Sequence, residues 1–281
     1  MKALELTIDW LSIANITDID QLLLEVDEQP IIAKSWSCWQ TCLYDCLVQS
    51  KQLYSQIKDP QIPLIWLLPA LSFNNELKQM LAASLKQLFA TPDEHMLFFG
   101  ASSMHAAIKL ASNKNWQQAN IAALDATYRV NAEGAFSYQG TGAALATLTF
   151  KNNGWIQQGY GLVPAVDFVT HSPVNGVLSQ LLELNSQAID VIFAPGNGID
   201  TDDWLNYLPL LSRAINEHTH YQLLNYRLGK IGALEGLVNI YHLTSCSEHV
   251  MQYQHALMIS QEQQNHQAAA SYLWISEEIH N

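Results

Sequence analysis

Basic residues are scarce in this chain. Its 281 residues include 13 lysines and arginines against 26 aspartates and glutamates, for a formal net charge of −13. A nucleic-acid-binding face and docking on anionic lipid both need clustered basic side chains, so the composition argues against both. The acidic balance instead favours a partner that presents a basic patch.

Cysteine and long hydrophobic runs are scarce as well. Three of the four cysteines fall within Cys38–Cys46, which is not the framework of a disulfide-stabilised secreted protein. The longest apolar run, Ile62–Phe73, is short and broken by Pro63 and Pro69, so no membrane span is expected. The N-terminus lacks the apolar core of a signal peptide. We therefore expect a cytoplasmic protein.

Strand and helix periodicities alternate along the chain, which predicts an α/β fold with helix-covered sheets. No linker divides it, so one domain is expected over residues 1–281. The expected strands are Leu4–Trp10, Pro63–Leu68, Met96–Phe99, Asn120–Leu124, Gly142–Phe150, Trp155–Val163, Ile189–Phe193, Tyr221–Tyr226, Val250–Ser260 and Ala270–Ile275. The expected helices are Asp18–Val26, Ser35–Ile57, Glu76–Phe89, Ser102–Asn113, Val174–Leu184, Asp202–Glu217 and Ile231–Leu243. An Asn-Asn-Gly turn at 152–154 could pair the strands on either side of it as a hairpin.

Five segments follow one another in an order that is typical of one enzyme family. They are FFGASSMHAAIKLA at Phe98–Ala111, NIAALD at Asn120–Asp125, GTGAALATLTF at Gly140–Phe150, IDVIFAPGNGIDTDD at Ile189–Asp203 and LLNYRLGKIGALEG at Leu223–Gly236. In the same order they resemble the nucleophile segment TACSSSLHAL, the strand ADVALAGGADA, the strand GEGAAALVLE, the loop NAHGTGTPLND and the GHxxGxxG segment. The chain thus resembles the β-ketoacyl synthases of the thiolase superfamily.

This resemblance implies a thiolase-like layered α/β fold of two related halves, residues 1–150 and 151–281, abbreviated at the N-terminus. The first 95 residues resemble the family only loosely. Members pair through the strand next to the nucleophile helix, here Asn120–Asp125, so the resemblance also implies a dimer. It implies no metal and no cofactor.

The three catalytic positions implied by the resemblance carry none of the family's side chains. Gly100 stands where the family has a cysteine at a helix N-terminus. Pro195 stands at the first histidine and offers neither a side-chain donor nor a backbone N–H. Tyr226 stands at the second histidine, and a phenol with a reference pKa of about 10 is a poor base at neutral pH.

An acyl pocket without the condensing residues is a further implication. Besides Gly100 and Tyr226, its candidates are His105, Asn197 and Asn225, whose side chains could hydrogen-bond an acyl thioester. For His105 the alternative is a packed core histidine with satisfied nitrogens.

Other clusters have plainer interpretations than the chemistry they suggest. Cys38, Cys42 and Cys46 share a helix face, and small buried side chains explain them better than a metal site does. The aspartates 200, 202 and 203 suit the start of a helix, where the dipole favours acidic residues.

The resemblance therefore implies a non-condensing ketosynthase-like subunit, similar to the chain-length factors, which assists a fatty-acid or polyketide synthase. It would form a homodimer or a heterodimer with an active ketosynthase, or bind an acyl carrier protein. The alternative is a cysteine-independent acyl-thioester decarboxylase or hydrolase that uses Tyr226, Asn225 and Asn197. A fold does not by itself fix an activity.

Overall fold

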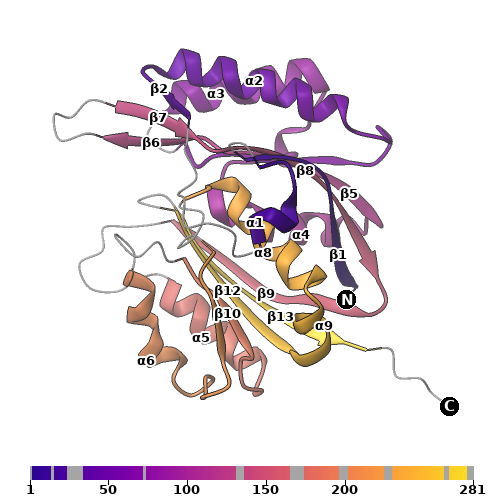
Figure 1. The fold of residues 1–281 in the computed structure, drawn as a ribbon, viewed down its shortest axis with the longest axis vertical. Helices are drawn as coiled ribbons and strands as arrows, with labels where there is room; N and C mark the ends of the chain where they lie inside the picture. Colours follow the sequence, from indigo (N-terminus) through magenta and orange to yellow (C-terminus); the bar gives the residue numbers. More distant parts are fainter. Residues whose placement is uncertain are drawn as a thin grey trace.

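The protein is built from stacked layers of helices and strands (Figure 1). A computed structural model describes residues 2–13, 16–23, 34–71, 74–130, 136–164, 174–195, 202–224, 230–262 and 266–276. Ten strands form one continuous sheet, and a separate sheet of three strands lies beside it. Within the described ranges, no helix has both the length and the apolar character that crossing a bilayer requires.

The ten-stranded sheet consists of two halves with the same topology. The first half has the order β4-β3-β5-β8-β1 and the second has the order β11-β10-β12-β13-β9. When the five strands of each half are numbered in chain order, both halves have the order 3-2-4-5-1 across the sheet. In both halves the fifth strand is antiparallel to its two neighbours, while the second, third and fourth strands are parallel. The first half comprises β1 (Ala3–Ile13), β3 (Leu64–Leu67), β4 (Met96–Leu97), β5 (Gln118–Leu124) and β8 (Gly142–Lys151). The second comprises β9 (Gly154–Pro164), β10 (Val191–Phe193), β11 (His220–Gln222), β12 (His255–Glu262) and β13 (His266–Ile275).

Helices cover the sheet on three levels, with one central layer between its two halves (Figure 1). The outer layer of the first half holds α2 (Trp39–Ser55) and α3 (Asn75–Phe89). The outer layer of the second half holds α5 (Val174–Leu184), η3 (Asp202–Tyr207) and α6 (Leu208–Leu211). The central layer holds α1 (Ile19–Leu23), η2 (Gly100–Ser102), α4 (Ser103–Asn113), α8 (Ala233–Ser245) and α9 (Ser247–Gln252), and η1 (Asp93–His95) precedes β4.

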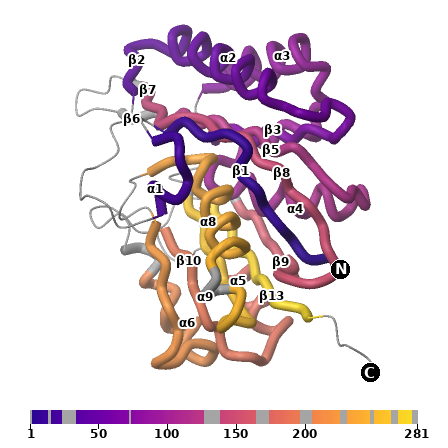
Figure 2. The backbone as a smooth tube through the Cα atoms, turned by 45° about the vertical axis from the view of Figure 1, so that its right-hand side comes forward, coloured from indigo at the N-terminus to yellow at the C-terminus, as the bar shows by residue number. Residues whose placement is uncertain are grey.

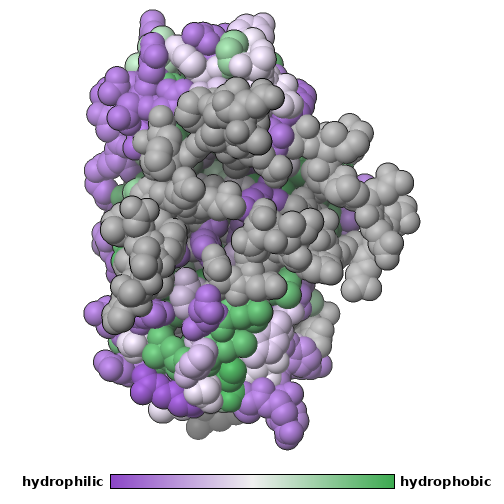
Figure 3. Space-filling view, turned by 90° about the vertical axis from the view of Figure 1, so that its left-hand side faces the viewer, coloured by the Kyte–Doolittle hydropathy of each residue, from purple (hydrophilic) through white to green (hydrophobic). Residues whose placement is uncertain are grey.

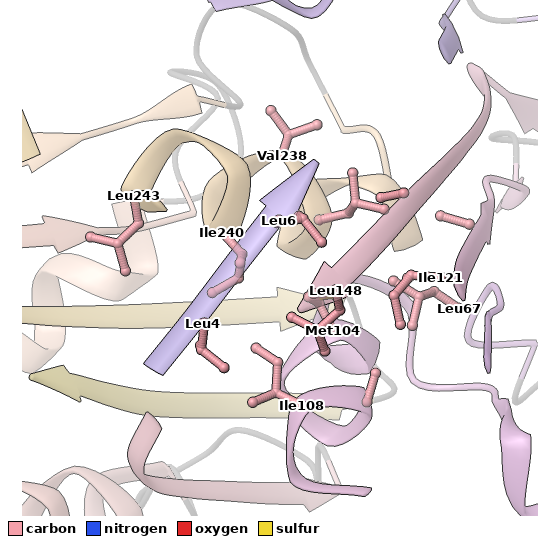
Figure 4. Close-up of a cluster of buried hydrophobic side chains, with 14 of the residues drawn as sticks. Leu4, Leu6, Leu67, Met104, Ile108, Ile121, Leu148, Val238, Ile240 and Leu243 are labelled. Carbon is pink, nitrogen blue, oxygen red and sulfur yellow. The ribbon is translucent and has the colours of Figure 1, made fainter. Parts of the chain in front are cut away.

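Three hydrophobic clusters fill the spaces between these layers. In β3, Ile65 and Leu67 belong to the central cluster and Trp66 to the outer one, because successive side chains of a strand point to opposite faces. The central cluster is the largest, and Figure 4 shows side chains of β1, α4 and α8 meeting in it. Both faces of the sheet are therefore covered, as its largely apolar strands require.

The position of β1 corrects the predicted hairpin. β8 and β9 are not paired, because β1 lies between them (Figure 2). It pairs with β8 along its whole length and with β9 through Leu4 and Trp155. The Asn-Asn-Gly turn does reverse the chain between β8 and β9. If these two strands paired directly, however, β1 could not hydrogen-bond to both of them.

The strand predicted to pair two copies is an interior strand. β5 is hydrogen-bonded to β3 on one side and to β8 on the other. It has no free edge to offer a second chain, so the prediction that Asn120–Asp125 forms the dimer contact is wrong. In the described part of the ten-stranded sheet, β4 and β11 are the edge strands.

Several element boundaries also differ from the predicted ones. The helix expected over Asp202–Glu217 is a 3-10 turn followed by the short α6, which ends at Leu211. Residues 250–252 belong to α9, not to a strand. The three-stranded sheet, in the order β2-β7-β6, was not predicted; it consists of β2 (Lys34–Trp36), β6 (Thr127–Val130) and β7 (Phe136–Gly140).

The first 95 residues resemble the family only loosely, yet they supply β1, β3, α2 and α3 of the first half. The local rules for α3 hold there: Asn74 caps the helix by accepting a hydrogen bond from the Leu77 amide at 2.9 Å. The division of the chain at residue 150 stays a prediction.

A glycine allows the two main central helices to approach each other. A Cβ atom at Gly236 of α8 would lie 2.7 Å from the carbonyl oxygen of Ala101 and 2.9 Å from the Cβ of Met104. Real side chains do not approach that closely, so any larger residue must push α8 away from η2 and α4.

We expect Gly236→Ala to destabilise the protein by about 1–3 kcal/mol, because it overpacks this contact. Gly176→Ala on α5 is the matched control, since nothing lies within 4 Å of a Cβ atom there. The control should leave stability unchanged or raise it by about 0.5–1 kcal/mol through helix propensity. Urea unfolding of both variants measures this, and equal effects would contradict the packing argument.

Candidate functional site

The turn from β4 into the central helix lies at the middle of the molecule. Gly100 is buried and has φ +55°, in the left-handed region that favours glycine. Its amide donates to the carbonyl oxygen of Leu68 at 3.1 Å, which ties the turn to the end of β3. The strand, sharp turn and buried helix expected around Gly100 are all present, and a glycine stands at the turn.

The second half repeats this turn. Gly232 precedes α8 with φ +50°, just as Gly100 precedes α4. The residues that follow these glycines, Ala101 and Ala233, are buried and carry only a methyl group. At both helix starts, then, neither the glycine nor the residue after it has a nucleophile or an acid–base group.

Two serines follow Gly100. The Ser103 hydroxyl donates to the Leu97 carbonyl at 2.9 Å and accepts from the Phe99 amide at 3.1 Å, so it braces the turn. Ser102 is fully buried, and its hydroxyl has no hydrogen-bond partner among the described residues. Without a neighbouring base to take its proton, a serine hydroxyl is a weak nucleophile.

The cysteines lie away from this turn. Cys42 and Cys46 belong to the cluster under α2, on the other face of the first half-sheet from α4. They are buried, as the plainer interpretation of this helix face predicts. The hydrogen bond with Cys42, together with burial, raises the pKa of Cys46. Cys246 follows the last turn of α8, about 20 Å from Gly232 by the rise of a 13-residue helix. The described structure therefore brings no thiol to Gly100.

His105 lies one turn into α4, in a buried polar cluster. Its Nδ1 is 2.7 Å from the hydroxyl oxygen of Tyr272, and its Nε2 is 3.2 Å from Ser260 Oγ. Gln157 donates through Nε2 to Tyr272 at 3.2 Å and to the His105 carbonyl at 3.1 Å. The cluster joins α4 of the first half to β9, β12 and β13 of the second.

Burial lowers the pKa of His105 to about 4, so its imidazole is neutral at neutral pH. Because Gln157 already donates to Tyr272, we assign the phenol proton to His105 Nδ1, and the imidazole N–H at Nε2 then donates to Ser260. Both ring nitrogens have partners. The geometry favours the packed-residue interpretation of His105.

Of the remaining predicted site residues, the structure describes Pro195. Pro195 is buried just beyond the carboxyl end of β10. Asn197, Asn225 and Tyr226 lie outside the described residues, as does Asp200. In the described ranges, no group of three or more His, Cys, Asp or Glu side chains lies close enough to hold a metal ion.

Asp125 is a buried carboxylate at the carboxyl end of β5 that the sequence did not single out as a site residue. Its side chain accepts hydrogen bonds at Oδ2 from the Thr141 amide at 2.9 Å and the Thr141 hydroxyl at 2.6 Å. Its Oδ1 has no partner among the described residues, and 2% of the residue is exposed. Burial raises its pKa to about 6, against the opposing effect of the Thr141 bonds.

The signal for Asp125 was present: an acid directly after an apolar strand marks the carboxyl edge of a parallel sheet, where α/β proteins place functional groups. The partners of His105 had no such signal. Gln157, Ser260 and Tyr272 lie at least 52 positions from it along the chain.

Comparisons with known proteins give a likeness in structure. No protein-family model matches this sequence, and no curated protein does either. Among solved structures, one chain of the AntDE:AntF complex, described as a type II PKS acyl-carrier protein with its ketosynthase bound to the hexaketide, matches with a TM-score of 0.55 and 14% identity. That match covers 98% of this chain and 100% of the other. The ishigamide ketosynthase/chain length factor matches with a TM-score of 0.50 and 10% identity, over 78% of this chain and 75% of the other.

These matches, with the repeated strand order, confirm the expected fold: the chain has a ketosynthase-like, thiolase-type α/β fold of two related halves. At such identities the likeness establishes the fold alone. The activity has to be argued from the residues at the site.

The raised pKa of Asp125 predicts a pH-dependent cost of folding. A carboxyl group whose pKa is higher in the folded than in the unfolded state contributes stability at low pH, which is lost as the pH rises through about 6. A shift of roughly two pKa units corresponds to about 3 kcal/mol. We therefore expect Asp125→Asn to be more stable than the wild type above pH 7, with the difference shrinking towards pH 4.

The stability of Asp125→Asn has to be compared with that of the wild type at each pH, because His105 also affects the pH dependence of stability. His105 has a lowered pKa, so its contribution is present above its unfolded pKa near 6.5 and is lost as the pH falls towards about 4. The two groups thus oppose each other in the wild-type curve. Chemical denaturation from pH 4 to 8 measures the difference, and a constant difference would contradict the buried charge.

Tyr272→Phe should destabilise the protein by about 1–3 kcal/mol, because it leaves the buried His105 Nδ1 and the Gln157 amide each without one partner. Tyr54→Phe is the control: Tyr54 is 40% exposed, and its ring contact with Phe89 does not need the hydroxyl. Thermal denaturation compares the two variants, and a loss of under about 0.5 kcal/mol for Tyr272→Phe would show that the cluster contributes little to holding the two halves together.

Proposed function

We propose that this protein is a non-condensing ketosynthase-like subunit that assists a fatty-acid or polyketide-type synthase. In this proposal it pairs with an active ketosynthase or receives an acyl carrier protein, and the partner supplies the condensing residues. Its own contribution is a scaffold that completes the assembly or shapes the space for the growing acyl chain.

The observation that carries the proposal is Gly100 at the start of the central helix. Condensation in the resembling family needs a thiolate at this point, where the helix N-terminus lowers the thiol pKa. Gly100 supplies no side chain, and Ala101 after it only a methyl group. Cys42 and Cys46 lie on the far side of a sheet, and Cys38 is the N-cap residue of α2 above that same face. Cys246 lies at the opposite end of α8.

The preserved scaffold supports a role in assembly. The turn at Gly100 has a left-handed glycine, α8 packs against the residues that follow it, and a large hydrophobic cluster surrounds both helices. Two of the matching structures are described as a ketosynthase with its acyl-carrier protein and as a ketosynthase/chain length factor. A fold kept while its nucleophile position is a glycine is what a non-condensing partner of such enzymes requires.

The charge of the chain narrows the kind of surface that it can meet. With a net charge of −13, the chain repels acidic partners over most of its surface. Contact with an acidic protein therefore needs a basic or neutral site on this chain or on its partner. A ketosynthase partner would therefore present a basic patch to this subunit.

The rival function, thioester decarboxylation or hydrolysis without a cysteine, depends on Tyr226, Asn225 and Asn197. These residues lie outside the described part of the chain, and no described contact favours the rival. It remains distinguishable by experiment, because it predicts turnover by the chain alone.

The first test is condensation and thioester turnover by the purified protein. We expect none above buffer with malonyl and acyl thioesters, and none from Gly100→Cys, because Pro195 cannot replace a histidine. Gly100→Cys should also cost about 1–2 kcal/mol of stability, since a side chain at φ +55° is strained. Turnover by the wild-type chain would contradict the proposal, and its loss in Tyr226→Phe would establish the rival.

The second arm of the test identifies the partner. The tagged protein, purified from its native host, should bring down a cysteine-bearing ketosynthase or a carrier protein near stoichiometry. Adding that ketosynthase should give condensation that depends on the ketosynthase cysteine and is unchanged by Cys42→Ala in this chain. Recovery of this chain without either protein would contradict the pairing.

A further inference from the structure

The connection between β8 and β9 lies where the two half-sheets meet. Two residues, Asn152 and Asn153, connect the end of β8 to Gly154 at the start of β9. β1 lies between these strands, and it pairs with β9 only through Leu4 and Trp155. In the described part of the ten-stranded sheet, this pairing joins one half to the other. The length of the connection therefore sets the position of β9 against β1.

Asn153 has the surroundings of an asparagine that can react with its own backbone. It lies outside the helices and strands, its side chain is exposed, and that side chain makes no hydrogen bond to a described residue. Gly154 follows it, so no side chain shields the backbone nitrogen that the carboxamide has to meet. The connection lies beside the N-terminus at the right of Figure 1, on the face turned away from the viewer in Figure 3. The apolar surface in the lower part of Figure 3 is on the opposite side, so contacts made there leave Asn153 open to water.

We propose that Asn153 is a site of spontaneous deamidation, with water as the co-reactant. The backbone nitrogen of Gly154 attacks Cγ of Asn153 and forms a new C–N bond. The bond from Cγ to the side-chain nitrogen breaks, and ammonia leaves with the proton of the Gly154 amide. Water then opens the succinimide ring at one of its two carbonyl groups. One product is aspartate, and the other is isoaspartate, in which the main chain runs through the side chain. The reaction needs neither the partner nor the substrate of the proposed function.

Isoaspartate lengthens this connection, whereas aspartate does not. The isoaspartate main chain gains one carbon atom, in a connection of only two residues. β8 is held to β1 along its whole length, so the added length displaces β9 and strains the pairing of Leu4 with Trp155. Gly154 has little room to absorb it, because Ala3 Cβ lies 3.4 Å and the Trp274 ring 3.9 Å from the position of a Cβ atom there. We therefore expect isoaspartate to loosen the junction between the halves.

The chain contains a matched control for the reaction. Asn175 and Gly176 form the same dipeptide and are both exposed, but they lie in α5. In a helix the Cα–Cβ bond is tilted towards the N-terminus, which holds the Asn175 carboxamide away from the following backbone nitrogen. Misplacing reacting atoms by about 1 Å can cost an intramolecular reaction about a hundred-fold, so we expect Asn153 to react at least about ten-fold faster than Asn175. A third Asn-Gly pair, at 197–198, lies outside the described residues.

The test is peptide mapping by mass spectrometry after the full chain has been incubated at neutral and at mildly alkaline pH. Deamidation replaces a side-chain nitrogen by oxygen, which changes the peptide mass, and chromatography separates isoaspartate from aspartate. The rate at Asn153 should rise with pH, because the attacking amide has to lose its proton. In urea, where the helix is lost, Asn153 and Asn175 should react at comparable rates. Equal rates in the folded protein would overturn the proposal, as would no reaction at Asn153 in the folded protein while the unfolded chain reacts there.

Substitutions in the connection separate the reaction from its effect. Asn153→Gln keeps a carboxamide but moves it one carbon further from the backbone, so it should prevent the reaction at this position. Asn152→Gln is the matched control and should react like the wild type. Both side chains are exposed, and a thermal melt confirms that the variants are folded. Reaction of Asn153→Gln at the wild-type rate would contradict the attack by the Gly154 nitrogen.

Hydrogen exchange then measures the junction itself. In the isoaspartate form the amides of Leu4 and Trp155 should exchange at least about ten-fold faster than in the fresh protein, because local opening there becomes easier. Asn153→Asp carries the added charge without the added length, and it should exchange like the fresh protein. Unchanged exchange in the isoaspartate form, or an equal increase in Asn153→Asp, would overturn the link between the modification and the junction.

Discussion

The close contact between α8 and the start of α4 is the constraint on which the rest of the structure depends. Gly236 lets α8 touch the backbone at Ala101, and the two helices fill the space between the halves of the sheet. Because protein interiors are close-packed, the spacing of this layer fixes the distance between the two half-sheets. It also fixes how closely α8 approaches the turn that follows Gly100.

The same packing shows that the fold does not depend on a side chain at Gly100. The closest approach of α8 to the start of α4 is made by Gly236 at Ala101 and Met104, not at Gly100. The positive φ at Gly100 is easier for glycine than for cysteine, so glycine is the less strained residue at this turn. The fold therefore does not need a side chain at this position, which is consistent with the non-condensing role that we propose.

The buried polar groups have two opposite effects: some link the two halves by hydrogen bonds, and others lower the stability of the fold. In the His105 cluster, hydrogen bonds between the two halves pair both ring nitrogens of His105. Because the imidazole is neutral and hydrogen-bonded, its burial is compatible with a stable fold. Asp125 is different, because one of its oxygens is unpaired among the described residues and its buried charge opposes folding at neutral pH. A buried carboxylate that lowers stability is a candidate for function.

Sequence alone determined the class of fold, the location of most helices and strands, and the absence of a side chain at Gly100. These follow from local rules: alternation in β1, the Asn74 cap of α3, and a strand turning into a helix at a glycine. Tertiary structure decided which strands are neighbours, so β1 entered between β8 and β9, and β5 became an interior strand. It also chose the partners of His105, which are distant along the chain. Hydrogen bonding between strands and packing between layers depend on the closure of long loops, and a local pattern of residues carries no information about which distant segment will supply the contact.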